Sequence, residues 1–134
     1  MIVVFDSGIW ISALQFGGTP AAVLERCVSV DRIAYCANIH EEILEAFERK
    51  FRVDPQTVEE RIQPFLHDAL WVEIVGVVTG ICRDPHDDFI LECALKAGAE
   101  FIVTGDHDLL VLSEFRGIPI ITARQYLDLP TGPA

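Results

Sequence analysis

Five aspartates in the second half of the chain are the side chains best suited to chemistry. Asp84, Asp87 and Asp88 form one cluster, and Asp106 and Asp108 form another. An apolar run with helical spacing and a short strand-like run separate the two clusters. Gathered carboxylates repel by about 4 kcal/mol for two charges about 4 Å apart at an effective dielectric of roughly 20. Protonation, a basic side chain or a cation must offset that repulsion, and hard oxygen ligands suit Mg²⁺ or Mn²⁺.

A sixth aspartate, Asp6, follows directly after the apolar residues 2–5 near the start of the chain. Asp106 likewise follows the apolar residues 101–103, after Thr104 and Gly105. In an open α/β sheet, ligands bind in the crevice outside the carboxyl ends of the strands, and helices begin in that same crevice. We therefore expect Asp6, Asp87 and Asp106 to share one cavity, although they are far apart in the sequence.

Helical spacing gives the two adjacent aspartates different directions. Asp87 shares a face with apolar residues three, four and seven positions later, so we expect its side chain to point toward the sheet. Asp88 is rotated by about 100° from it and faces the side of Glu92. Asp84 precedes a proline and is expected to lie outside the helix. A plainer alternative is that Asp87 and Asp88 only oppose the helix dipole and that Asp6 only ends a strand. Asp106 and Asp108 could likewise only cap the short helix that follows them.

The elements that must position these residues alternate between strands and helices. Apolar runs typical of strands lie at residues 2–5, 32–37, 71–78, 100–104 and 118–122. Helical spacing lies at residues 9–14, after Thr19, Asn38 and Pro55, and at residues 87–97, 109–115 and 123–127. This alternation predicts an α/β fold in which helices sandwich a mostly parallel five-stranded sheet with right-handed crossovers.

Length and composition fit one compact domain over residues 1–134. Apolar residues make up 51% of the chain, enough for a sizeable core. No apolar run reaches the roughly 18 residues that a membrane span needs. The amino terminus lacks the basic region of a secretory signal and instead resembles a buried strand. We therefore expect a cytoplasmic protein that does not contact a membrane.

The net charge of −11 argues against a simple basic clamp for nucleic acid. The same charge is compatible with an enzyme whose carboxylates bind divalent cations, which then contact the phosphates of a nucleic acid. The four cysteines lack the C-x-x-C spacing and are most simply small buried thiols. A mixed zinc site from Cys82, His86 and His107 lacks the usual ligand pairs.

Three segments carry a family resemblance: VVFDSGIWIS, ILEAFERKF and DPHDDFILECALKAGAEFIVTGDHDLL. Together with the order of strands and helices, they resemble the PIN-domain family of metal-dependent ribonucleases over nearly the whole chain. The likeness is strongest to VapC-like toxins of toxin–antitoxin pairs. It implies a three-layer α/β/α sandwich and a Mg²⁺- or Mn²⁺-dependent endoribonuclease that hydrolyses RNA phosphodiester bonds.

Family members place an acidic residue in each of four slots, which match Asp6, Glu45, Asp87 and Asp106 in this chain. The resemblance implies that the three aspartates hold the metal. Glu45 would complete the metal's ligands or orient the attacking water. The assignment of Glu45 rests on the resemblance alone, because its helix carries several glutamates on the same polar side.

Other positions match the family less strictly. Ser7 fills a hydroxyl slot, in which it would bind a phosphate oxygen or a metal-bound water. Asp84, Asp88 and Asp108 look like accessory acidic positions. Gly8 stands where asparagine is common, and this departure would loosen the turn or remove a hydrogen bond without touching a metal ligand.

Two alternatives remain open from the sequence. A non-catalytic interaction module with the PIN fold would explain Gly8 and the strong acidity. A phosphatase or phospho-receiver would need an aspartate after the third strand and a lysine after the fifth, and this chain has neither.

The resemblance implies RNA as substrate, an antitoxin as a partner, and a homodimer. The region of Trp10 and Phe16 is a candidate contact surface, although Trp10 fits the core better.

Overall fold

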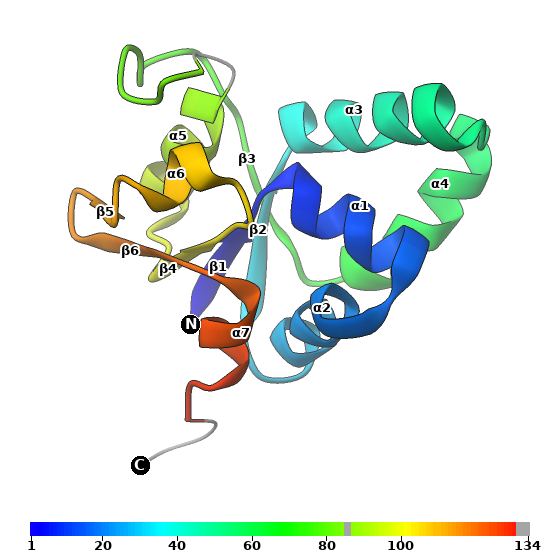
Figure 1. Ribbon diagram of the computed structural model, residues 1–134, viewed down its shortest axis with the longest axis horizontal. Helices are drawn as coiled ribbons and strands as arrows, with labels where there is room; N and C mark the ends of the chain where they lie inside the picture. The colour runs from blue at the N-terminus through cyan, green and yellow to red at the C-terminus, as the bar shows by residue number, and fades with distance from the viewer. Residues whose placement is uncertain (85–86, 131–134) are drawn as a thin grey trace.

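The computed structural model describes residues 1–84 and 87–130, which form an α/β fold (Figure 1). Within these ranges one sheet has six strands in the order β3-β2-β1-β4-β6-β5. The strands are β1 (Ile2–Phe5), β2 (Arg32–Cys36), β3 (Leu70–Val72), β4 (Phe101–Val103), β5 (Glu114–Phe115) and β6 (Ile118–Ile121). All neighbours pair in parallel except β5, which pairs antiparallel with β6. The predicted mostly parallel sheet is confirmed, with six strands instead of five.

Helices cover both faces of this sheet. One side carries α1 (Ser7–Phe16), α2 (Gly18–Val30), α3 (Ala37–Ala46), the π-helical turn η1 (Phe47–Phe51), α4 (Pro55–Ile62) and the 3₁₀ turn η2 (Gln63–Phe65). The other side carries α5 (Asp88–Ala97), which packs against β1, β2 and β3. The short helices α6 (His107–Leu110) and α7 (Ala123–Leu127) follow β4 and β6. The expected sandwich is therefore present.

The central strand β1 explains where a ligand would bind. Val3, Val4 and Phe5 are fully buried because helices cover both faces of β1. Strands β2 and β3 lie on one side of β1, and strands β4, β6 and β5 lie on its other side. Ligands in α/β proteins bind where the strand order reverses in this way. The carboxyl ends of β1 and β4 therefore mark the expected site.

The predicted third strand, residues 71–78, is too long. β3 ends at Val72, because the buried Glu92 carboxylate binds the chain beyond it. That carboxylate accepts hydrogen bonds from the backbone N–H groups of Val75, Gly76 and Val77 at 2.7, 2.9 and 2.8 Å. These N–H groups therefore bond to a helix side chain instead of a neighbouring strand, so this segment of the chain forms a loop.

The predicted helix at residues 109–115 is also wrong at its end. Helix α6 stops at Leu110, and Glu114–Phe115 forms β5. Arg116 and Gly117 have positive φ angles of 49° and 84°, so the chain turns sharply into β6. The glycine at the second of these positions adopts that conformation without a side-chain clash.

The aromatic core confirms that Trp10 is a buried residue. Its ring lies 5.2 Å from the Tyr35 ring and 5.8 Å from the Phe65 ring, in edge-to-face geometry. Trp10 is therefore unavailable for partner contacts. All four cysteines are buried and free, as expected. Within residues 1–84 and 87–130, no helix is both long enough and apolar enough to cross a bilayer.

Candidate functional site

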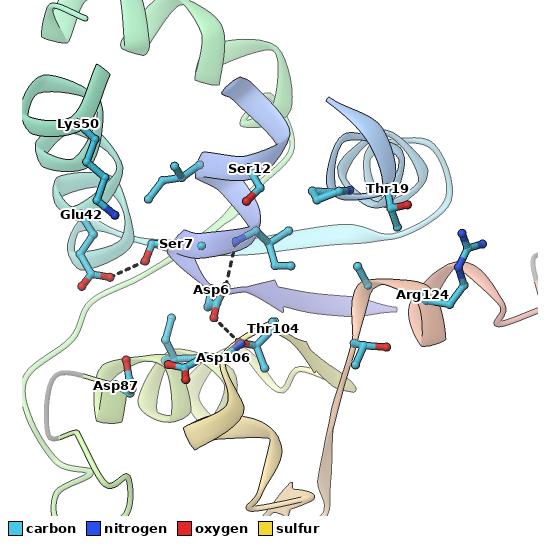
Figure 2. Close-up of a pocket in the computed structure, with 18 residues that line it drawn as sticks. Asp6, Ser7, Ser12, Thr19, Glu42, Lys50, Asp87, Thr104, Asp106 and Arg124 are labelled. Carbon is cyan, nitrogen blue, oxygen red and sulfur yellow. Dashed lines mark hydrogen bonds between the residues drawn. The ribbon is translucent and has the colours of Figure 1, made fainter. Parts of the chain in front are cut away.

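A pocket of about 730 Å³ opens at the carboxyl ends of β1 and β4 (Figure 2). Its lining includes the carboxylates of Asp6, Glu42, Asp87 and Asp106. These residues come from the end of β1, from α3, from the start of α5 and from the turn after β4. The structure therefore brings Asp6, Asp87 and Asp106 together, as the sequence predicts.

Asp6 ends β1 and also caps α1. Its Oδ1 accepts the Ile9 N–H at 3.0 Å, and its Oδ2 accepts the Thr104 hydroxyl. Only 8% of the residue is exposed, and this burial raises the pKa of Asp6 to about 6. The two hydrogen bonds oppose the rise in pKa, whereas the charges of Asp106 and Glu42 add to it.

Thr104 connects the two strand ends. It is fully buried, and besides donating to Asp6 it accepts the Asp106 backbone N–H at 2.9 Å. Asp106 then caps α6, since its Oδ1 accepts the Asp108 N–H at 2.9 Å. One threonine hydroxyl therefore fixes the spacing between the Asp6 side chain and the Asp106 backbone.

Asp87 lies half-buried at the edge of the pocket, contrary to the expectation that it faces the sheet. Asp87 is the N-cap of α5 and has helical φ and ψ angles of −83° and −11°, yet its side chain is only half-buried at the pocket. Burial raises the pKa of Asp87 to about 7, with further increases from the charges of Asp106 and Asp84. A hydrogen bond with the Asp106 side chain and the charge of Glu42 raise it further.

Asp88 is the buried member of the pair and serves the loop. Its carboxylate accepts the N–H groups of Gly80 at 2.9 Å and of Cys82 at 2.8 Å. Asp88 does face the same side as Glu92, which binds the preceding part of this loop. The structure therefore assigns Asp88 to anchoring the loop and not to the lining of the acidic pocket.

Glu42 occupies the fourth acidic position in the pocket, and Glu45 does not. The Ser7 hydroxyl donates to Glu42 Oε1 at 2.7 Å and holds this carboxylate beside Asp6. Glu45 is exposed and lies 3.7 Å from Arg49, outside the lining of the acidic pocket. A signal for Glu42 was present in the sequence, because apolar residues lie three positions before it and four after it. Glu45 has no apolar residue at either of these spacings on either side.

The remaining predicted positions lie around the pocket. Asp108 Oδ1 is 3.8 Å from Arg83 Nη1, and the charge of Asp84 acts on Asp87. A Cβ atom added at Gly8 would lie 3.4 Å from Asp6 Oδ1, so the glycine leaves space beside this carboxylate. His86, the suggested zinc ligand, lies outside the described residues.

The donor set suits a hard divalent cation, because all four acidic side chains offer carboxylate oxygens. As the side chains stand, no three His, Cys, Asp or Glu residues in the described part of the chain are close enough to hold a metal ion. Asp6 is fixed by Ile9 and Thr104, whereas Asp87 is half-buried at the pocket edge. Binding would therefore require the carboxylates of Asp87 and Asp106 to turn toward Asp6.

The fold and the pocket define an α/β protein with clustered carboxylates at the switch point of its sheet. The sequence model of the family described as PIN domain matches residues 2–108, which include all four acidic pocket residues. The chain belongs to the PIN-domain family, which confirms the resemblance seen in its sequence.

Comparison with solved structures shows the same fold. The crystal structure of VapBC2 from Rickettsia felis bound to a DNA fragment from its promoter matches with a TM-score of 0.64 and 14% identity. The match covers 91% of this chain and 98% of that chain. The strands and helix after residue 108 extend the same sheet and its covering layer beyond the family match. No curated protein matches the chain by sequence.

Proposed function

We propose that this PIN domain is a Mg²⁺- or Mn²⁺-dependent endoribonuclease that hydrolyses RNA phosphodiester bonds. One observation carries the proposal, the convergence of Asp6, Glu42, Asp87 and Asp106 in one pocket. Among the described residues, no Lys or Arg forms an ion pair with any of these four carboxylates. The pKa values of Asp6 and Asp87 are raised as a result of burial and mutual repulsion, which a bound cation would relieve.

The residues of the pocket would have different roles in the reaction. Asp6, Asp87 and Asp106 would hold the metal, and Glu42 takes the role that the resemblance gave to Glu45. A divalent cation in such a site activates water and neutralises charge on the phosphate. Glu42 lies where it could accept a proton or orient the attacking water, and Ser7 keeps it in place through their hydrogen bond.

The fold likeness to VapBC2 supports a proposal for the biological role. We propose that the chain is the toxin component of a toxin–antitoxin pair and binds an antitoxin protein. The proposal includes a homodimer, a single PIN domain over residues 1–134, and action on RNA in the cytoplasm. Co-purification with the product of a neighbouring reading frame would test the antitoxin part.

Cleavage of a labelled RNA with Mn²⁺, in the unaltered protein and in Asp6→Asn, tests the enzyme. Substitutions of residues that merely orient metal ligands cost about 10- to 100-fold, so we expect a loss of more than about 100-fold. Asp54→Asn is the matched control, because Asp54 also caps a helix but is exposed and far from the pocket. Equal cleavage by both variants would refute the assignment of Asp6.

A non-catalytic PIN-fold module is the second candidate. It is favoured by the observation that, within the described residues, no three acidic or other ligating side chains are yet within metal-binding distance of each other. Calorimetric titration with Mn²⁺ separates the two candidates. The enzyme requires saturable binding that Asp6→Asn removes, whereas the module requires no binding in either protein.

A further inference from the structure

We propose that the groove between α1 and the α3–η1 segment binds single-stranded RNA beside the acidic pocket, with Lys50 on a phosphate and Phe16 against a base. The inference rests on the proposed ribonuclease function and adds the path of the substrate. The metal ligands and the other acidic residues do not define this path. Three observations support it: a second cavity, an unpaired cation and an exposed aromatic ring.

The groove is continuous with the acidic pocket. A smaller cavity of about 180 Å³ lies between α1 and α3–η1. It shares Ser7, Ile11, Glu42 and Lys50 with the acidic pocket. A polymer whose scissile phosphate lies at Asp6 can therefore continue into this groove without leaving the surface.

Lys50 is the cation placed to receive a phosphate there. Five of the ten Lys and Arg side chains have hydrogen-bond or ion-pair partners among the described residues: Arg26, for example, donates to the backbone carbonyls of Tyr126 and Leu127. Lys50 has no hydrogen bond or ion pair within the described residues, and its amine points toward Ser7 and Glu42 in Figure 2. An unpaired ammonium at the mouth of an acidic pocket would attract the phosphate next to the scissile one.

An exposed aromatic ring lies next to the segment that carries Lys50, outside the lining of either cavity. Phe16 is 73% exposed, more than any other large hydrophobic residue in the described part of the chain. Its ring contacts the Phe51 ring edge-on, with centroids 6.0 Å apart. Phe51 directly follows Lys50, so this ring contact places Phe16 beside the η1 segment that carries Lys50. Cations alternating with aromatic rings are typical of surfaces that bind single-stranded nucleic acid.

Two basic residues give this groove contacts for phosphates, although Glu42 and Glu45 line it as well. The chain has a net charge of −11, so a polyanion can approach only where local cations allow it. Arg49 and Lys50 line the groove, and the Arg49–Glu45 pair is exposed and 3.7 Å long, which makes it weak and easily exchanged for a phosphate. Glu45 would therefore lie beside the bound RNA and outside the metal site.

The experiment measures binding without cleavage. A fluorescein-labelled single-stranded RNA of mixed sequence is titrated in EDTA and followed by fluorescence anisotropy at several salt concentrations. We expect Phe16→Ala and Phe16→Leu to weaken binding roughly 5- to 150-fold, and Phe16→Trp to retain it, because only an aromatic face stacks on a base. We expect Lys50→Gln to reduce the slope of log affinity against log salt by about 0.7, the value for one phosphate contact to a single strand.

Arg61→Gln is the matched control for Lys50→Gln. Arg61 is exposed on α4, has no partner within the described residues and lies outside both cavities. We expect it to leave the affinity and the salt slope unchanged. In Mn²⁺-dependent cleavage, the groove variants should raise KM while keeping kcat, since they touch the flanking RNA and not the reacting phosphate.

Three results would overturn the groove. The first is that Phe16→Leu and Lys50→Gln leave the RNA affinity and the KM unchanged. If Asp6→Asn still abolishes cleavage in that case, the groove proposal fails and the ribonuclease proposal stands. The second is loss of affinity in Arg124→Gln alone, since Arg124 lines the opposite end of the pocket (Figure 2). The third is a dimer that Phe16→Ala converts to a monomer without a change in RNA affinity. If the unaltered protein binds RNA through these residues but never cleaves it, the groove stands and the ribonuclease proposal fails.

Discussion

Asp6→Asn is expected to stabilise the metal-free protein at pH 8 while abolishing its activity. The substitution removes a buried charge and keeps the shape of the side chain. The asparagine Oδ1 can still accept the Ile9 N–H, and its NH₂ group can donate to Thr104 Oγ1. Asparagine is also as good a helix N-cap as aspartate. The variant therefore isolates the electrostatic cost of the carboxylate.

The size of the effect follows from the raised pKa of Asp6. Burial, with the charges of Asp106 and Glu42, raises that pKa from 3.8 to about 6. Each pKa unit corresponds to about 1.4 kcal/mol, so the ionised side chain costs the folded state about 3 kcal/mol. Because the folded pKa is the higher one, this cost is absent below about pH 4 and complete above about pH 6. We expect Asp6→Asn to gain about 1–3 kcal/mol at pH 8, or on the order of 5–10 °C in Tm.

Thermal unfolding by circular dichroism in EDTA at pH 4, 6 and 8 measures this gain. The advantage of Asp6→Asn should be largest at pH 8 and vanish near pH 4. Asp54→Asn is the control, because hydrogen bonding to Thr57 holds the pKa of Asp54 below its usual value. The same substitution there should give no gain at pH 8. Added Mn²⁺ should stabilise the unaltered protein and leave Asp6→Asn unchanged.

Two outcomes would contradict this reasoning. If Asp6→Asn is less stable than the unaltered protein at pH 8, the Asp6 carboxylate contributes more through its hydrogen bonds than it costs through burial. If the gain is equal at pH 4 and pH 8, it does not arise from ionisation. In either case the pocket would not hold an uncompensated charge, and the main argument for a cation there would be lost.

Three further predictions follow from the same contacts. Glu42→Gln should reduce RNA cleavage by more than about 10-fold, whereas Glu45→Gln should keep kcat, as measured by steady-state kinetics with Mn²⁺. The affinity for Mn²⁺ should rise between about pH 5 and pH 8 in calorimetric titrations, because the cation must displace protons from Asp6 and Asp87, whose pKa values are raised to about 6 and about 7. Glu92→Gln should destabilise the protein by about 2–3 kcal/mol in urea unfolding, because Glu92 accepts charge-assisted bonds from a loop. Burial opposes ionisation of Glu92, but these bonds and Lys96 lower its pKa to about 2, so the loss should shrink as pH falls from about 4.5 toward 2.

The convergence of the aspartates could be predicted because it depends on local rules. Asp6 and Asp106 each follow a short apolar run, and the ends of neighbouring parallel strands meet at one edge of a sheet. The neighbours themselves, β1 and β4, are far apart in the sequence. The alternation of strands and helices was enough to place both strand ends on the same side of the sheet.

Other features could not be predicted because they depend on long-range contacts. The loop after β3 looks like a strand from its β-branched residues, and only the position of Glu92 on α5 diverts its N–H groups. The family resemblance favoured Glu45 although the apolar spacing around Glu42 was a signal for Glu42, and the contact of Glu42 with Ser7 depends on the packing of α3 against α1. Asp87 precedes α5 as its N-cap and is half-buried in the lining of the pocket, a degree of exposure that helical spacing alone did not predict.

The adjacent residues Asp87 and Asp88 show why only some carboxylates of this acidic chain are available to a cation. The Asp88 oxygens each accept a backbone N–H from the loop, so its charge is already solvated by the protein. Asp87 instead has its pKa raised to about 7, first by burial and then by the negative charges of Asp106 and Asp84. A cation gains most by binding where the protein has left the charge unsolvated. The number of acidic residues therefore does not define the site; their burial and mutual repulsion within one pocket do.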